Sequence, residues 1–168
     1  MNFFNFKTRL INRKNKGFTM IEVMTCITII MIAFVAIFTL INDSMAFHDL
    51  AYSRLTASYL AQEGIEIVRN IRDTNYLNDR PWNTGLTKGD YQVQYDSTEL
   101  EPYNNDRLLL DSETELYNYN SGTPTRYKRK INIKEDADYT ITVTSIVSWS
   151  NRGGDFDIKV EDHLFDWQ

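Results

Sequence analysis

The longest apolar run of the sequence is the feature that constrains the fold of this chain most strongly. Nineteen consecutive residues, 23–41, carry no charged side chain. As an α-helix the run would be about 28 Å long, close to the roughly 30 Å hydrocarbon core of a bilayer. A helix that is apolar on every face is difficult to bury in a soluble protein of 168 residues. The run therefore predicts a membrane-spanning helix, with a buried core helix as the alternative.

The charges on both sides of the run indicate its orientation. Residues 1–16 contain five basic residues and no acidic one, whereas Asn42 and Asp43 follow the run. Because basic flanks stay cytoplasmic, we expect a single-pass protein of the cytoplasmic (inner) membrane, with its N-terminus inside and its C-terminal domain outside. A cleaved secretory signal is an alternative, since residues 44–46 (Ser-Met-Ala) have the small-residue pattern of a cleavage site. The apolar run is, however, longer than such signals usually have.

Glu22 places a carboxylate at the edge of the apolar run. A charge in a bilayer costs about 2.5–3.5 kcal/mol at the centre of a helix and less near the interface, so such a group usually has a partner. The nearest basic residue in the sequence is Lys16. The Glu22 side chain either extends to the lipid headgroups or pairs with a group from another chain.

Residues 16–23 resemble the prepilin signature of type IV pilins and of the pseudopilins of type II secretion. In that family a basic leader ends in Gly, an aromatic residue follows, and Glu occupies the fifth position after the cleavage site. The corresponding residues here are Gly17, Phe18 and Glu22, followed by the apolar run. Met20 stands where Leu is common in the family, and a leader of 17 residues is long for it.

The resemblance implies a structural subunit, a minor pilin or pseudopilin, rather than an enzyme. A prepilin peptidase would cut after Gly17 and N-methylate Phe18, and Glu22 would pair with the Phe18 ammonium of a neighbouring subunit during assembly. The implied partners are this peptidase, other pilin or pseudopilin subunits and the membrane, and the destination is a pilus or pseudopilus filament. The alternative function is a signal-anchored membrane protein whose external domain binds a ligand or acts as a sensor.

Composition excludes several other classes. The 18 Lys+Arg and 23 Asp+Glu give a net charge of −5, which does not indicate a nucleic-acid partner. The single cysteine, Cys26, cannot form an intramolecular disulfide. With two distant histidines, and with no Ser/His/Asp arrangement, phosphate-binding glycine loop or HExxH motif, the sequence predicts no catalytic residue, cofactor or metal centre. A calcium site is left open at acidic residues near a turn, although their spacing matches no EF-hand: Asp155, Asp157, Glu161 and Asp162.

A helical pattern continues beyond the apolar run. Apolar and small side chains recur at helical spacing between residues 50 and 71, and no Pro or Gly interrupts residues 18–63. We therefore expect one helix of about 80 Å from about Phe18 to about Arg72. Its transmembrane assembly half would be residues 18–41, and its amphipathic half residues 42–72, after the leader of residues 1–17.

Two features of the amphipathic half lead to separate expectations. Gly64 lies on its apolar face, where a glycine costs about 1 kcal/mol relative to alanine, so we expect it to allow a sheet to approach closely. The charged residues nearby predict a solvent-exposed face with local ion pairs, and subunit contacts are the alternative. These residues are Glu63, Glu66, Arg69 and Arg72.

Alternating patterns predict an external sheet domain at residues 73–168. Strands are expected at 91–95, 127–134, 139–149 and 156–160, with a hairpin turn at 151–155. The predicted fold is therefore α+β and pilin-like, with a long N-terminal helix packed against an antiparallel sheet of about four strands.

Residues 96–126 are polar and predict a long surface connection with one short strand or helical turn near residues 108–110. A packed loop is the simpler interpretation. A partner surface is the alternative, because exposed tyrosines suit protein contacts. The tyrosines concerned are Tyr103, Tyr117, Tyr119 and Tyr127.

Overall fold

The computed structural model describes residues 17–135, 140–151 and 154–166. Contacts within the chain divide it into two compact units, 1–46 and 47–168. Helix α1 (Met20–Leu77) contributes residues to both units. Three sequence expectations fall outside the described residues: most of the leader (1–16), the start of one predicted strand at Tyr139, and the centre of the predicted hairpin turn, Arg152 and Gly153.

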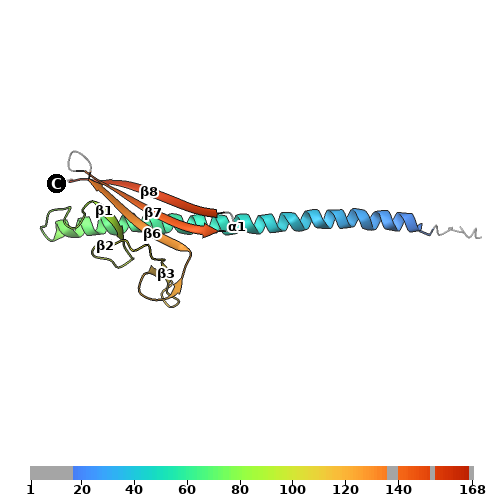
Figure 1. Ribbon diagram of the computed structural model, residues 1–168, viewed down its shortest axis with the longest axis horizontal. Coiled ribbons are helices and arrows are strands. Elements are labelled where there is room, and N and C mark those ends of the chain that lie inside the picture. Colours follow the sequence, from blue (N-terminus) through green and yellow to red (C-terminus); the bar gives the residue numbers. More distant parts are fainter. Residues whose placement is uncertain (1–16, 136–139, 152–153, 167–168) are drawn as a thin grey trace, which may run out of the picture. The chain divides into compact units, whose positions relative to one another are not determined.

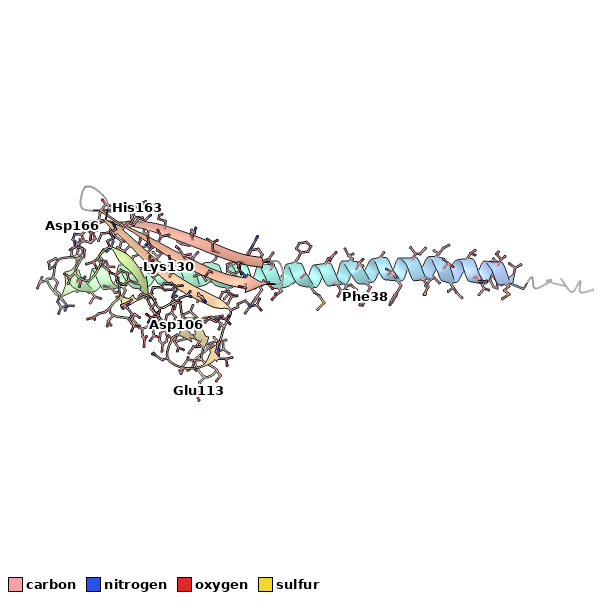
Figure 2. The ribbon with its side chains drawn as sticks, in the orientation of Figure 1. Phe38, Asp106, Glu113, Lys130, His163 and Asp166 are labelled. Carbon is pink, nitrogen blue, oxygen red and sulfur yellow. The ribbon has the colours of Figure 1, made fainter. Side chains whose placement is uncertain are left out.

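In the first unit, the described residues from Met20 onward form the N-terminal part of α1. Every side chain from Gly17 to Ala46 is exposed. Figure 2 shows one of them, Phe38, standing out from the helix, and 58% of its surface is accessible. By length and composition α1 is able to cross a membrane. A helix that is apolar and uncovered on all sides is suited to lipid or to neighbouring helices.

The second unit combines the part of α1 from Phe47 onward with two antiparallel sheets (Figure 1). The larger sheet has the order β2-β1-β6-β7-β8 and the smaller one β4-β3-β5. The larger sheet consists of β1 (Gly89–Gln92), β2 (Glu101–Pro102), β6 (Tyr127–Glu135), β7 (Ile141–Asn151) and β8 (Gly154–Leu164). The smaller sheet consists of β3 (Leu109–Leu110), β4 (Tyr117–Asn118) and β5 (Thr123–Pro124).

The α+β fold with a long N-terminal helix on an antiparallel sheet is confirmed. The four expected strands correspond to β1, β6, β7 and β8, and β2 adds a fifth. Of the short strand or helical turn expected near residues 108–110, the structure has the strand, β3. It pairs with β4 and β5, so residues 96–126 are more than a connection. The helix ends five residues later than predicted, at Leu77. Buried Asn75 supports this last turn by donating hydrogen bonds to the Trp82 and Thr84 carbonyls.

At Gly64, β6 and β7 approach α1 closely. A Cβ atom added to Gly64 would lie 2.6 Å from Ser145 Oγ, 2.8 Å from Ile131 Cδ1 and 3.2 Å from Arg129 Cδ. The expectation that this glycine allows close approach of a sheet is therefore confirmed. The core continues on both sides of it, with Val68 and Val147 fully buried.

A buried arginine joins α1 to the sheet beside Gly64. Arg129 on β6 is completely buried, and its guanidinium donates hydrogen bonds to the Leu60 carbonyl (3.0 Å), the Glu63 carboxylate (2.6 Å) and the Val93 carbonyl (2.6 Å). The expectation that Glu63 belongs to a solvent-exposed face with only local pairs is therefore wrong. The sequence pattern places Glu63 at the border of that face, but it does not reveal a cation inside the sheet.

The other charged residues of this helix face are partly as expected. Local pairs join Glu66 to Arg69 (3.4 Å) and Arg72 to Asp73 (2.7 Å). Arg69 also reaches Asp162 on β8, at 2.8 Å. The face therefore contains local pairs together with contacts that anchor the sheet to the helix.

Candidate functional site

The predicted cleavage and assembly residues lie where α1 begins. Thr19 is the N-cap of the helix, because its side-chain Oγ1 accepts a hydrogen bond from the Glu22 backbone N–H (3.3 Å) and its carbonyl accepts one from the Val23 N–H (3.2 Å). Thr-x-x-Glu is the sequence pattern of a capping box. The Glu22 carboxylate also lies in the first helical turn, where it is stabilised by the partial positive charge of the helix N-terminus.

The Glu22 backbone N–H therefore takes part in the helix cap, a role that the sequence analysis did not consider. The Thr-x-x-Glu spacing was the signal that would have revealed it. A capping role and a pairing role are compatible, because a carboxylate that stabilises the start of its own helix still has acceptor capacity for a second donor.

Gly17 and Phe18 directly precede this cap. A Cβ atom at Gly17 would have no heavy atom within 4 Å, and Gly17 lacks the positive φ that favours glycine. Phe18 is 81% exposed. Within the part of the chain that the structure describes, nothing requires glycine at position 17.

The acidic residues considered for calcium do not form one group. Strand alternation places Asp162 on the side of β8 that faces α1, whereas Asp155, Asp157 and Glu161 are exposed on the opposite side. The hydrogen bond from Arg69 is the main reason that the pKa of Asp162 lies below its usual value. Within residues 17–135, 140–151 and 154–166, no group of three or more His, Cys, Asp or Glu side chains is arranged to hold a metal ion.

The tyrosines of the polar segment belong mainly to the core. Tyr127 is buried, and the Tyr117 ring packs against it edge to face, with ring centroids 6.2 Å apart. The Tyr119 hydroxyl donates a hydrogen bond to the Arg129 carbonyl (3.2 Å). Burial raises the pKa of Tyr119 to about 12. The half-buried Tyr103 ring lies 5.9 Å from Lys130 Nζ. The packed interpretation of this segment therefore fits better than a tyrosine-rich partner surface.

Comparison with known families adds a finding at the N-terminus. Residues 12–38 match the family model described as the prokaryotic N-terminal methylation motif. This chain carries that motif. The matched region includes Gly17, Phe18, Glu22 and most of the apolar run, so the motif supports the similarity to type IV pilin-like proteins. No curated protein and no solved structure matches the chain.

Proposed function

We propose that this protein is a structural subunit, a minor pilin or pseudopilin, of a type IV filament or of a type II secretion-like machine. The observation that carries the proposal is the methylation motif at residues 12–38, which leads into a helix that is apolar and exposed on all sides. In such a subunit, residues 18–41 would cross the membrane before assembly and contact neighbouring helices afterwards. Residues 42–72 and the sheet domain at 73–168 would lie outside the cytoplasm.

Processing by a prepilin peptidase would cut after Gly17 and methylate the new N-terminus at Phe18. The surroundings of Gly17 support this proposal, because neither its backbone conformation nor its neighbours require a glycine. A requirement at this position would therefore come from outside the chain, as expected for the narrow active site of a peptidase.

Cleavage would place a positive ammonium group on Phe18, one residue before the helix cap. The partial positive charge of the helix N-terminus disfavours a cation there. A carboxylate from Glu22 of a neighbouring subunit would compensate this charge, and each of the two groups would otherwise be expensive in lipid. Pairing of the two groups would also fix how far one helix is shifted along the next.

The first test is the intact mass and N-terminal peptide of the protein isolated from its native membrane. A terminus at Phe18 carrying one methyl group is the expected result. A terminus at Met1 would contradict the proposal and favour a signal-anchored protein with an external ligand-binding or sensory domain. A terminus just after Ala46 would indicate a secreted soluble protein.

Substitution of Gly17 tests the origin of the glycine requirement. Gly17→Leu should leave folding unchanged, because the added side chain meets no neighbour, but it should abolish processing. Met20→Leu, which introduces the residue common in the family, is the matched control and should be processed normally. Both results are read from the mass of the membrane-bound protein.

Three variants separate the two roles of Glu22. Glu22→Gln keeps the capping-box pattern, in which Gln serves as well as Glu, but removes the charge. Thr19→Ala keeps the charge but removes the cap, at a cost of about 1 kcal/mol in helix stability. We expect Glu22→Gln and Glu22→Val to insert into the membrane but to assemble poorly, and Thr19→Ala to assemble. Normal assembly of Glu22→Gln would exclude the charge pair.

A further inference from the structure

The strand β8 forms an open edge of the larger sheet (Figure 1). It is 11 residues long and pairs with β7 along its whole length, from Gly154 to Leu164. In an antiparallel ladder, alternate residues direct their N–H and C=O groups to one neighbour, so about half of the β8 backbone groups face outward. Among the residues that the structure describes, no strand pairs with this outer side. The opposite edge, β2, has only two residues and ends in Pro102.

β8 is held in place by contacts with α1. Asp162 accepts a hydrogen bond from Arg69 (2.8 Å), and the guanidinium of Arg54 lies 5.9 Å from the centre of the Phe156 ring. Beyond the end of the strand, the Tyr76 hydroxyl lies 2.7 Å from the Asp166 carboxylate. These contacts hold β8 in a fixed position, so a further strand would pair with an edge that is already ordered.

The two faces of β8 differ in chemistry. Phe156, Ile158 and Val160 point toward the helix side, but they are only half buried, because β8 is the last strand of the sheet. A shallow cavity of about 510 Å³ lies between Val160 and α1. Its α1 lining is mixed, with Tyr59 and Ile65 beside the polar or charged Gln62, Glu63, Glu66 and Arg69. The other face of β8 is exposed and mainly acidic: Asp155, Asp157, Lys159, Glu161 and His163.

We propose that this edge binds an extended segment of a different polypeptide, in which apolar and basic side chains alternate. The segment would add a sixth strand to the sheet through the outward backbone groups of β8. Because side chains alternate between the faces of a strand, its apolar residues would lie beside the half-buried Phe156, Ile158 and Val160. Its basic residues would lie beside the acidic face of β8, where opposite charges on adjacent strands attract.

The charges argue against a second copy of this chain as the occupant. β8 contains four acidic residues and one lysine, so two copies of it would bring like charges together. The chain has an alternating apolar and basic segment of its own, β6, but this strand lies between β1 and β7. A charged edge is also a common means by which proteins prevent identical sheets from joining. The inference goes beyond the proposed function and does not depend on cleavage after Gly17.

The binding test uses the full chain in a nonionic detergent and a ten-residue peptide that alternates valine and lysine. A peptide that alternates valine and glutamate is the control. We expect only the lysine peptide, and not the glutamate peptide, to bind. It should slow the hydrogen exchange of alternate β8 amides by about tenfold or more, as measured by NMR, because hydrogen-bonded amides exchange only when the structure opens. Protection of alternate amides distinguishes strand addition from simple charge attraction.

A charge reversal on the same edge provides the second measurement. The double variant Asp157→Lys/Glu161→Lys should weaken binding of the lysine peptide by about tenfold and create binding of the glutamate peptide, because each cross-strand charge pair changes sign. The matched control reverses two exposed acids outside β8, Glu99→Lys/Glu113→Lys, and should bind like the unmodified chain; Figure 2 shows Glu113 on the part of the chain that forms the small sheet. Thermal unfolding establishes that both variants fold.

Several results would overturn the inference. They are no binding of the lysine peptide at millimolar concentration, binding without protection of β8 amides, and equal binding of both peptides. Protection of β8 amides that rises with the concentration of the protein alone would identify a second copy as the occupant, contrary to the charge argument.

Discussion

The substitution Gly64→Ala measures how closely the sheet approaches α1. In an exposed helix this change stabilises by about 1 kcal/mol. Here the new Cβ would lie 2.6 Å from Ser145 Oγ and 2.8 Å from Ile131 Cδ1, both closer than atoms in folded proteins tolerate. Overpacking of this kind costs about 1–3 kcal/mol. After the gain in helix propensity is subtracted, we expect the free energy of unfolding to fall by up to about 2 kcal/mol.

A second substitution tests which atom causes the loss of stability in Gly64→Ala. Ser145 Oγ is the nearest neighbour of the added Cβ, and it is buried without a hydrogen-bond partner among the described residues. Ser145→Ala alone should therefore be neutral or stabilise by up to about 1 kcal/mol, because it removes an unsatisfied polar atom. In the double variant the closest clash is absent, so the two changes should couple by about 1–2 kcal/mol.

The assay is chemical unfolding of the full chain in nonionic detergent, followed by near-ultraviolet circular dichroism. The buried Trp82 and Trp149 report on the core of the sheet domain. Gln62→Ala, at an exposed position of the same helix, is the matched control and should change stability by less than about 0.5 kcal/mol. The reasoning is refuted if Gly64→Ala stabilises the protein, or if the coupling with Ser145→Ala is zero.

Three further predictions concern other buried or paired groups. Arg129→Met should lower the free energy of unfolding in urea by about 3–5 kcal/mol, because it removes the hydrogen-bond donor of two backbone carbonyls and of the Glu63 carboxylate. A decrease below about 1 kcal/mol would contradict this expectation. The pKa of Asp162 is lowered by Arg69, so its contribution to stability is present above about pH 4 and is lost as the pH falls through the folded-state pKa; Asp162→Asn should therefore reduce the difference in unfolding free energy between pH 7 and pH 3. Burial raises the pKa of Tyr119 to about 12, so the folded state binds this proton more tightly than the unfolded state and loses stability as the pH rises from about 10 to 12. Tyr119→Phe should reduce this loss of stability at alkaline pH. If the free energy of unfolding of the variant changes with alkaline pH as in the unmodified chain, the role assigned to Tyr119 is wrong.

The strand pattern shows what local sequence is able to predict. β6, β7 and β8 are each long enough for apolar and polar residues to alternate over several periods, so their existence was predicted. Strands of two residues, such as β2 and β3, contain no period, and only their partners define them. For the same reason the region of the small sheet was predicted as a connection with one short strand or helical turn.

The N-terminal site was predictable because its residues are adjacent in the chain. Gly17, Phe18 and Glu22 are recognised by order and spacing, and their proposed roles in cleavage and assembly remain predictions. The cap formed by Thr19 was equally local, and its Thr-x-x-Glu spacing was overlooked.

The sequence by itself determined the features that depend on neighbours along the chain: the apolar helix, its basic flank, the methylation motif and the long strands. Only the tertiary structure decided which distant groups meet. It placed Arg129 of β6 beside Glu63 of α1, and it left β8 at an open edge. The physical reason is that periodicity records which face of an element is buried, whereas a buried ion pair and a free sheet edge depend on which elements become neighbours in space.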